Sequence, residues 1–194
     1  MPHDAIEHEE HVAATRRWLE RAVIGLTLCP FAKAVHVRGQ VRYVLSDART
    51  PGALLTDLAG ELVHLQATDP RVTDTTLLIH PHALADFQDY NAFLDDADAA
   101  VDALGLAGEI QVASFHPDYV FADADLDDPA NCTNRSPFPM LHLLREDSVA
   151  RAVATYPDPD AIVERNIATL ERLGVDGYAR LLTRADSAPL TLPE

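Results

Sequence analysis

The stretch Thr75-Thr76-Leu77-Leu78-Ile79-His80-Pro81-His82 decides how we interpret the fold of this chain. Its unbroken apolar run is typical of a strand that is covered on both faces, as strands of parallel sheets are. Val41–Leu45 and Ile110–Phe115 are two further segments rich in residues that favour strands. Helical patterns separate the three segments. Strands that alternate with helices favour parallel pairing through right-handed crossovers.

The helices are predicted from apolar spacing and from residues that start or stop a helix. Pro30 ends the first helix, Thr50 and Pro51 begin the second, and Gly105 closes the third. The predicted helical ranges are 8–28, the segment from Pro51 onward, 84–104, 141–155, 158–174 and about 176–184.

This order of elements predicts a small three-layer α/β domain, or an α+β relative, with a largely parallel sheet and helices on both faces. Residues 117–139 show no clear helix or strand pattern, so we expect a long Pro-rich loop there, with room for an extra antiparallel strand. Loops of this length are usually functional or disordered. A length of 194 residues favours a single domain over 1–194, with a core at about 8–185 and a polar C-terminal tail.

The composition excludes several classes of partner. The chain carries 31 acidic and 15 basic residues, a net charge of −16, so we expect it to repel nucleic acid. It has neither a signal peptide pattern nor an apolar run of about 20 residues, and we therefore expect a cytoplasmic protein without membrane contact. Glycine-rich nucleotide motifs and signatures for haem or flavin are absent. The sequence leaves the oligomeric state open.

His80 and His116 each follow a predicted strand directly, and each is followed by a proline. If the strands are parallel, both histidines lie at the carboxyl edge of the sheet, where open α/β sheets build their sites. Held on stiff turns, they suit an acid/base pair or half of a divalent metal site, with His82 and His142 as further ligands. The alternative is two structural histidines that bond to the backbone.

Cys29-Pro30-Phe31 is similar to the redox motif of glutaredoxins, but the second cysteine of that motif is missing. Cys29 is expected to end a helix, where the helix dipole raises the thiol pKa. A nucleophile and a buried structural cysteine both stay open as interpretations of Cys29.

The segment Asn134-Arg135-Ser136 places amide, guanidinium and hydroxyl groups on a chain stiffened by prolines. An arginine on a rigid loop suits a carboxylate or phosphate, which it binds through two parallel hydrogen bonds. The alternative is an ion pair with an aspartate of the acidic segment 123–128. The remaining candidates for holding an anionic substrate are Tyr119, Arg38 and Lys33.

Three segments carry a family resemblance: 28–33 (LCPFAK), 114–119 (SFHPDY) and 134–146 (NRSPFPMLHLLRE). They resemble those of a bacterial family known only as domain of unknown function 1415, over residues 10–185. The resemblance implies a bacterial cytoplasmic protein and brings no activity. The family has an aromatic residue where Cys132 stands here, which argues against a shared catalytic role for Cys132.

These observations lead to three hypotheses. The first is an enzyme that acts on a small anionic molecule, with His116 as general acid or base, His80 assisting, Cys29 as nucleophile, and Arg135 and Asn134 holding the anion. The second is a non-catalytic module that binds a metabolite or a metal. The third is a protein-interaction domain that uses the Pro-rich loop as its contact surface.

Overall fold

The computed structural model describes residues 2–159 and 161–183. Its elements in chain order are α1 (Pro2–Trp18), the π-helical turn η1 (Leu19–Ile24), α2 (Ala32–Val37), β1 (Val41–Leu45), α3 (Pro51–Ala67), β2 (Thr75–Ile79), α4 (Phe87–Ala103), β3 (Ile110–Phe115), the 3-10 helix η2 (Pro129–Thr133), β4 (Met140–Arg145), α5 (Glu146–Thr155) and α6 (Ala161–Thr183).

The sheet is mixed, and the prediction of a largely parallel sheet is wrong in this respect. The strand order is β1-β2-β4-β3, with β1 parallel to β2, and β4 antiparallel to both β2 and β3. The three strands predicted from sequence run in one direction. Residues 117–139 bring the chain back over the edge where β3 ends, so β4 starts at that edge and runs the opposite way between β2 and β3.

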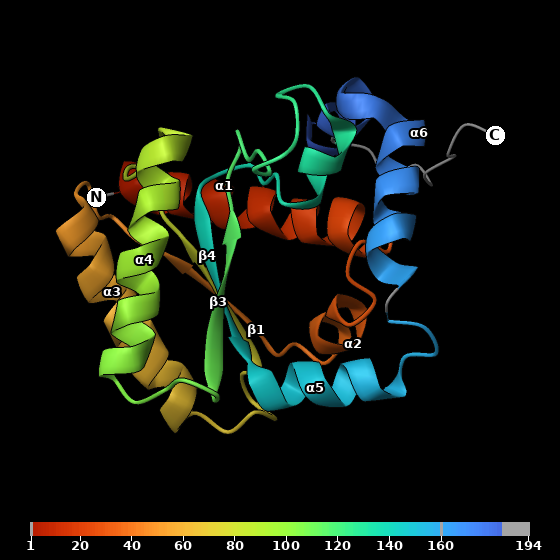
Figure 1. Cartoon of the computed structure of the whole chain (residues 1–194). Coiled ribbons are helices and arrows are strands. Elements are labelled where there is room, and N and C mark those ends of the chain that lie inside the picture. The colour runs from red at the N-terminus through yellow and green to blue at the C-terminus, as the bar shows by residue number, and fades with distance from the viewer. Residues whose placement is uncertain (1, 160, 184–194) are drawn as a thin grey trace.

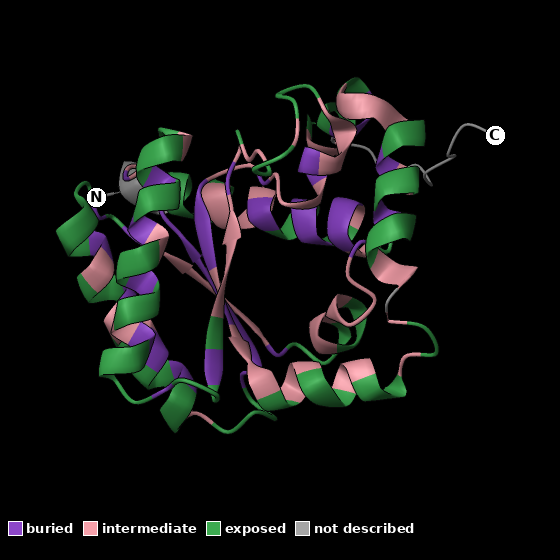
Figure 2. Cartoon of the chain, viewed as in Figure 1, coloured by how far each residue is buried: buried purple, intermediate pink, exposed green. Residues whose placement is uncertain are grey.

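Helices pack on both faces of the sheet (Figure 1), because alternate residues of each strand point to opposite faces. On one face Leu78, Leu141 and Leu143 pack with the apolar sides of α3 and α4. On the other face Leu77 and Met140 pack with α1, η1 and α6. Figure 2 shows that the buried residues of α3 and α4 face the sheet and the exposed ones face away from it.

Local signals set the ends of several helices as predicted. Thr50 Oγ1 accepts a hydrogen bond from the N–H of Ala53 at 3.3 Å and caps α3, with Pro51 in its first turn. Gly105, at φ 70°, follows the end of α4. Gly174, at φ 70° and ψ 162°, kinks α6 at the boundary expected between two C-terminal helices.

The predicted helix over 141–155 is half wrong, because Met140–Arg145 is the strand β4 and α5 begins only at Glu146. Residues 117–139 consist of turns and irregular chain around η2. The predicted C-terminal tail lies outside the described residues. Within the described ranges, the helices are all too short or too polar to cross a membrane.

Candidate functional site

His80 and His116 lie together at the sheet edge where β2 and β3 end, as the sequence predicts. Both side chains are fully buried. Their ring centroids lie 5.8 Å and 5.0 Å from that of Tyr90 on α4. The two histidines therefore share one environment on the α4 face of the sheet.

Both ring nitrogens of His116 form hydrogen bonds with backbone groups. Its Nδ1 accepts a hydrogen bond from the N–H of Asp118 at 3.1 Å, so Nε2 carries the proton and donates to the carbonyl of Leu84 at 3.2 Å. Burial lowers the pKa of His116 and keeps the ring neutral. These contacts favour the structural interpretation of His116 over a general acid or base.

His80 is bonded on one side only. Its Nδ1 lies 3.1 Å from the carbonyl of Ala83 and donates to it, so Nε2 is the acceptor nitrogen. Nε2 is buried and has no hydrogen-bond partner among the described residues. Burial lowers the pKa of His80 to about 4, and the ring is neutral at pH 7.

Arg135 holds the irregular segment that follows β3. Its guanidinium donates to the carbonyl of Tyr119 at 3.2 Å and to that of Leu126 at 2.7 Å. It bonds to backbone oxygens instead of forming the alternative ion pair with the acidic segment 123–128. These two hydrogen bonds order the loop that follows β3.

The neighbours of Arg135 are also engaged inside the protein. Asn134 Nδ2 donates to the carbonyl of Ser114 at 3.1 Å. Ser136 Oγ donates to the carbonyl of Phe138 at 2.7 Å. Both side chains tie the 134–138 segment to itself and to β3, which argues against a substrate-binding role for them.

The four candidate metal ligands do not converge. His142 lies on β4 and contributes to the sheet face opposite the one that holds His80 and His116, because its neighbours Leu141 and Leu143 face α3 and α4. His82 lies beside His11, with ring centroids 6.1 Å apart. Within residues 2–159 and 161–183 there is no group of three or more His, Cys, Asp or Glu side chains that would hold a metal ion.

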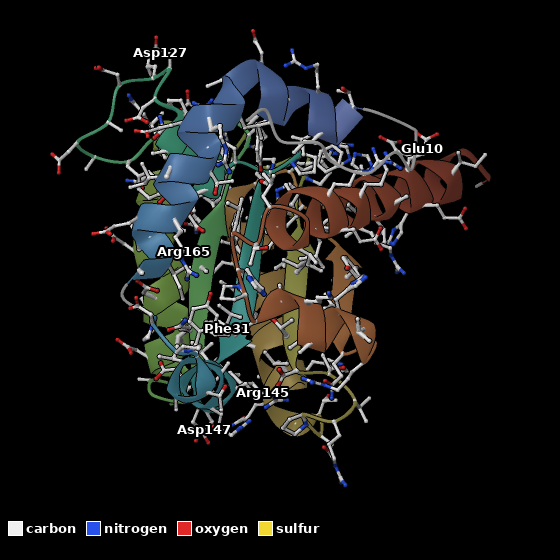
Figure 3. The ribbon with its side chains drawn as sticks, turned by 90° about the vertical axis from the view of Figure 1, so that its right-hand side faces the viewer. Glu10, Phe31, Asp127, Arg145, Asp147 and Arg165 are labelled. Atoms are coloured by element: carbon white, nitrogen blue, oxygen red, sulfur yellow. The ribbon has the colours of Figure 1, made fainter. Side chains whose placement is uncertain are left out.

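A cavity of about 730 Å³ lies against the sheet face that carries His142. This volume is in the usual range for small-molecule sites. The sheet forms its floor, α2 and α5 form two walls, and the end of α1 with η1 closes it. Neither α2 nor α5 has a buried residue, since both helices border the cavity. Figure 3 views the molecule from this side, with Phe31 and Arg145 labelled.

Basic residues gather at this cavity although the chain is strongly acidic. Arg38, Arg71, Arg145 and Arg151 line it, and Asp74 is the one acidic residue among its described lining residues. The lining therefore carries a positive balance within a chain of net charge −16. Like-charged groups repel one another, so gathering arginines has a cost unless an anion compensates it.

Two of the four arginines are already engaged. Arg71 pairs with Asp69 at 2.6 Å, and Arg145 donates to the carbonyl of Thr68 at 2.6 Å at the end of α3. Arg38 donates to Gln40 Oε1 and Arg151 to Ser148 Oγ, both neutral groups. Neither Arg38 nor Arg151 forms an ion pair with another described residue.

His142 presents a free acceptor nitrogen on the cavity floor. The Thr75 hydroxyl donates to the carbonyl of Leu143 at 2.6 Å, so His142 Nε2, at 2.7 Å from Thr75 Oγ1, must carry the proton. Nδ1 is then the acceptor and lacks a hydrogen-bond partner among the described residues. Burial lowers the pKa of His142 to about 4, which keeps Nδ1 unprotonated at pH 7.

Cys29 lines the same cavity. The pKa of its thiol is raised, as predicted, but the cause is burial and not the dipole of a preceding helix. Burial raises the pKa of the thiol. The N–H groups of Phe31 and Ala32 lower it by a smaller amount, because α2 begins at Ala32 and Cys29 precedes this helix. Lys33 is exposed on α2 and does not line the cavity.

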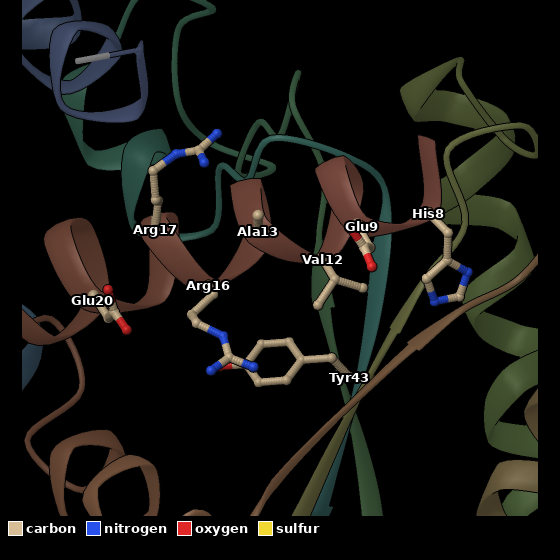
Figure 4. Close-up of a pocket in the computed structure, with 8 residues that line it drawn as sticks. All are labelled: His8, Glu9, Val12, Ala13, Arg16, Arg17, Glu20 and Tyr43. Carbon is tan, nitrogen blue, oxygen red and sulfur yellow. The ribbon is translucent and has the colours of Figure 1, made fainter. Parts of the chain in front are cut away.

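A second hollow, of about 600 Å³, runs along α1 (Figure 4). Its charges balance, with Glu9 and Glu20 beside Arg16 and Arg17. The guanidinium of Arg16 stacks over the ring of Tyr43 at 5.0 Å and covers it. This groove therefore offers no excess of charge to a ligand.

Sequence reasoning missed Asp74, Arg145, Ser148 and Arg151. The latter three lie in the helix predicted over 141–155, in which residues 141–145 form the first turn. A signal was available in Glu146 and Asp147, which are acidic residues of the first turn of α5 and mark a later helix start. A strand over Met140–Arg145 would then have placed His142 and Leu144 on the same face.

The comparisons with known proteins bear on the family alone. The model of a family described as "Protein of unknown function (DUF1415)" matches residues 10–180. Searches of curated proteins and of solved structures find no match.

Proposed function

This chain belongs to the DUF1415 family of unknown function, and we propose that it binds a small anionic molecule in the cavity between the sheet, α2 and α5. One observation carries the proposal: the described residues of the cavity lining include four arginines and one aspartate, in a chain of net charge −16. Arg38 and Arg151 supply the guanidinium groups, since other described residues do not neutralise them. The sequence also predicted a small anionic ligand, but at the edge of the sheet. We now propose that the binding site lies on the sheet face that carries His142.

A dye titration tests this proposal. Anilinonaphthalene sulfonate, an anionic fluorescent dye, is titrated against the wild type and the Arg38→Ala/Arg151→Ala variant. A hydrogen bond to a charged group contributes about 1.5–3 kcal/mol, so we expect the double variant to bind at least tenfold more weakly. Phenylnaphthylamine, an uncharged dye with the same aromatic body, should bind both proteins equally.

The control variant is Arg17→Ala/Arg49→Ala, which removes the same charge from exposed positions outside the cavity. If this control weakens sulfonate binding as much as the cavity variant does, the effect is one of overall charge and the proposal fails. Equal sulfonate affinity of all three proteins would also refute it.

Catalysis on the bound anion is the second candidate, and the placement of Cys29 and His142 in the same lining favours it. In this role His142 Nδ1 would accept the proton of the Cys29 thiol. Burial opposes this transfer on both sides, because it raises the pKa of the thiol and lowers that of His142 to about 4. Mass spectrometry of the ligand after long incubation with the protein tests for catalysis. If the ligand is recovered unchanged, binding alone is the function.

A further inference from the structure

The lining of the cavity changes from charged to mainly apolar along the direction of the strands. At the end where β1 and β2 start, the floor begins with a row of paired residues. This row includes Val41, Thr75 and Leu144. Gln40 and Asp74 directly precede this row, and Arg145 directly follows it. Arg38 bonds to Gln40, and Arg151 bonds to Ser148, which bonds to Asp74, so both arginines lie around the same end. The register of the sheet therefore places the charged groups at one end of the floor.

Toward the opposite end the floor is apolar except for His142. The next row contains Leu77, His142 and Ala113, and Phe115 follows on β3. The ring of Trp18 packs on that of Phe115 with centroids 5.1 Å apart, and Leu19 continues this wall. Phe115 is four residues along the sheet from the first row, a distance of about 13 Å.

We propose that the ligand is an amphiphilic carboxylate, with its head at Arg38 and Arg151 and an apolar chain lying along the floor toward Phe115. This inference rests on the proposed function and adds the ligand class. The polarity of the lining matches that of the molecule: charge at one end, hydrocarbon over the remaining length. Burial of that hydrocarbon supplies the larger part of the affinity.

A head of single negative charge fits this end of the cavity best. Ser148 Oγ donates to Asp74 Oδ1 at 2.6 Å and accepts from Arg151 at 2.9 Å, so one hydroxyl links a carboxylate of the protein to the guanidinium of Arg151. A phosphate dianion would meet stronger repulsion from Asp74 than a carboxylate does.

Calorimetric titration with hexanoate, octanoate and decanoate tests whether the cavity binds the alkyl chain of the ligand. Each buried methylene tightens binding about fourfold, so each pair of methylenes should lower the dissociation constant about 15-fold. Decyltrimethylammonium, with the same chain and a cationic head, should bind far more weakly than decanoate. Decyl phosphate should bind no more tightly than decanoate.

Ala113→Leu fills the middle of the floor and provides the matched variant. It should weaken decanoate at least tenfold while leaving hexanoate within about twofold, because the short chain ends before Ala113. Circular dichroism and the fluorescence of Trp18 establish that the variant is folded. Ala152→Leu, on the α5 wall of the cavity, serves if that variant does not fold.

Affinity that does not change with chain length overturns the inference, as does tighter binding of decyl phosphate. If the dye still binds in an arginine-dependent way, these results leave the proposed function standing. Loss of arginine-dependent dye binding would refute the proposed function itself.

Discussion

Acidification from pH 7 to pH 5 should destabilise this protein through His80. The folded state holds this ring neutral, with the pKa lowered from 6.5 to about 4 by burial. As the pH falls below 6.5, His80 binds a proton in the unfolded chain but stays unprotonated in the folded chain. The free energy of unfolding therefore decreases from about pH 6.5 downward, until the folded state also protonates near pH 4.

The size of this effect follows from the shift of the pKa. Each unit corresponds to 1.36 kcal/mol, so the complete loss is about 3 kcal/mol, of which about 2 kcal/mol is reached at pH 5. Proteins of this size are stable by about 5–15 kcal/mol, so the loss is readily measurable. Reduced repulsion among the acidic groups at lower pH acts in the opposite direction, which makes a variant necessary.

Urea unfolding followed by the fluorescence of Trp18, the single tryptophan, measures the effect. His80→Asn keeps a donor near Nδ1 for the carbonyl of Ala83 and removes the titration. Its stability should fall between pH 7 and pH 5 by about 2 kcal/mol less than that of the wild type. His64→Gln, at an exposed position on α3, should behave as the wild type. An equal pH dependence in wild type and His80→Asn would refute the argument from burial.

Three further predictions concern the framework. Tyr90→Phe should lower the free energy of unfolding by about 2 kcal/mol or more in urea, because the hydroxyl bonds to backbone groups of both β3 and β4; an unchanged stability would contradict these bonds. Gly174→Ala should cost about 1–3 kcal/mol, since φ 70° with ψ 162° suits glycine alone, whereas Gly60→Ala in α3 should not destabilise; equal effects of the two in thermal unfolding would rule out strain. Cys29 should react with iodoacetamide at pH 7 more slowly than free cysteine because its pKa is raised, as mass spectrometry would show; a faster reaction would mean that the helix N–H groups dominate.

Three of the four strands were predictable because their signals are local. The apolar run over Thr75–Ile79 and the β-forming residues of Val41–Leu45 favour strands through their own composition. The position of His80 and His116 at one edge followed from strand direction. Their structural role did not, since it depends on the carbonyls of Ala83 and Leu84, which the fold brings to the rings.

The fourth strand was missed because Met140–Arg145 carries no decisive local preference. Leucine and methionine favour helices at least as well as strands. The segment is extended because β2 and β3 offer unpaired backbone groups on both sides of it. Tertiary pairing here outweighs propensity, and it also turns His142 toward the cavity.

The sequence by itself determined three of the four described strands, the starts and ends of several helices, and the excess of negative charge, and it led to the expectation of an anionic ligand. These depend on neighbours along the chain or on composition. Only the tertiary structure decided which arginines meet: Arg38, Arg71, Arg145 and Arg151 come from segments that are far apart in sequence or were assigned to the wrong element. A cavity is made by surfaces that fail to meet after packing, and side chains gather around it through strand register and helix placement. No spacing along the chain records that geometry.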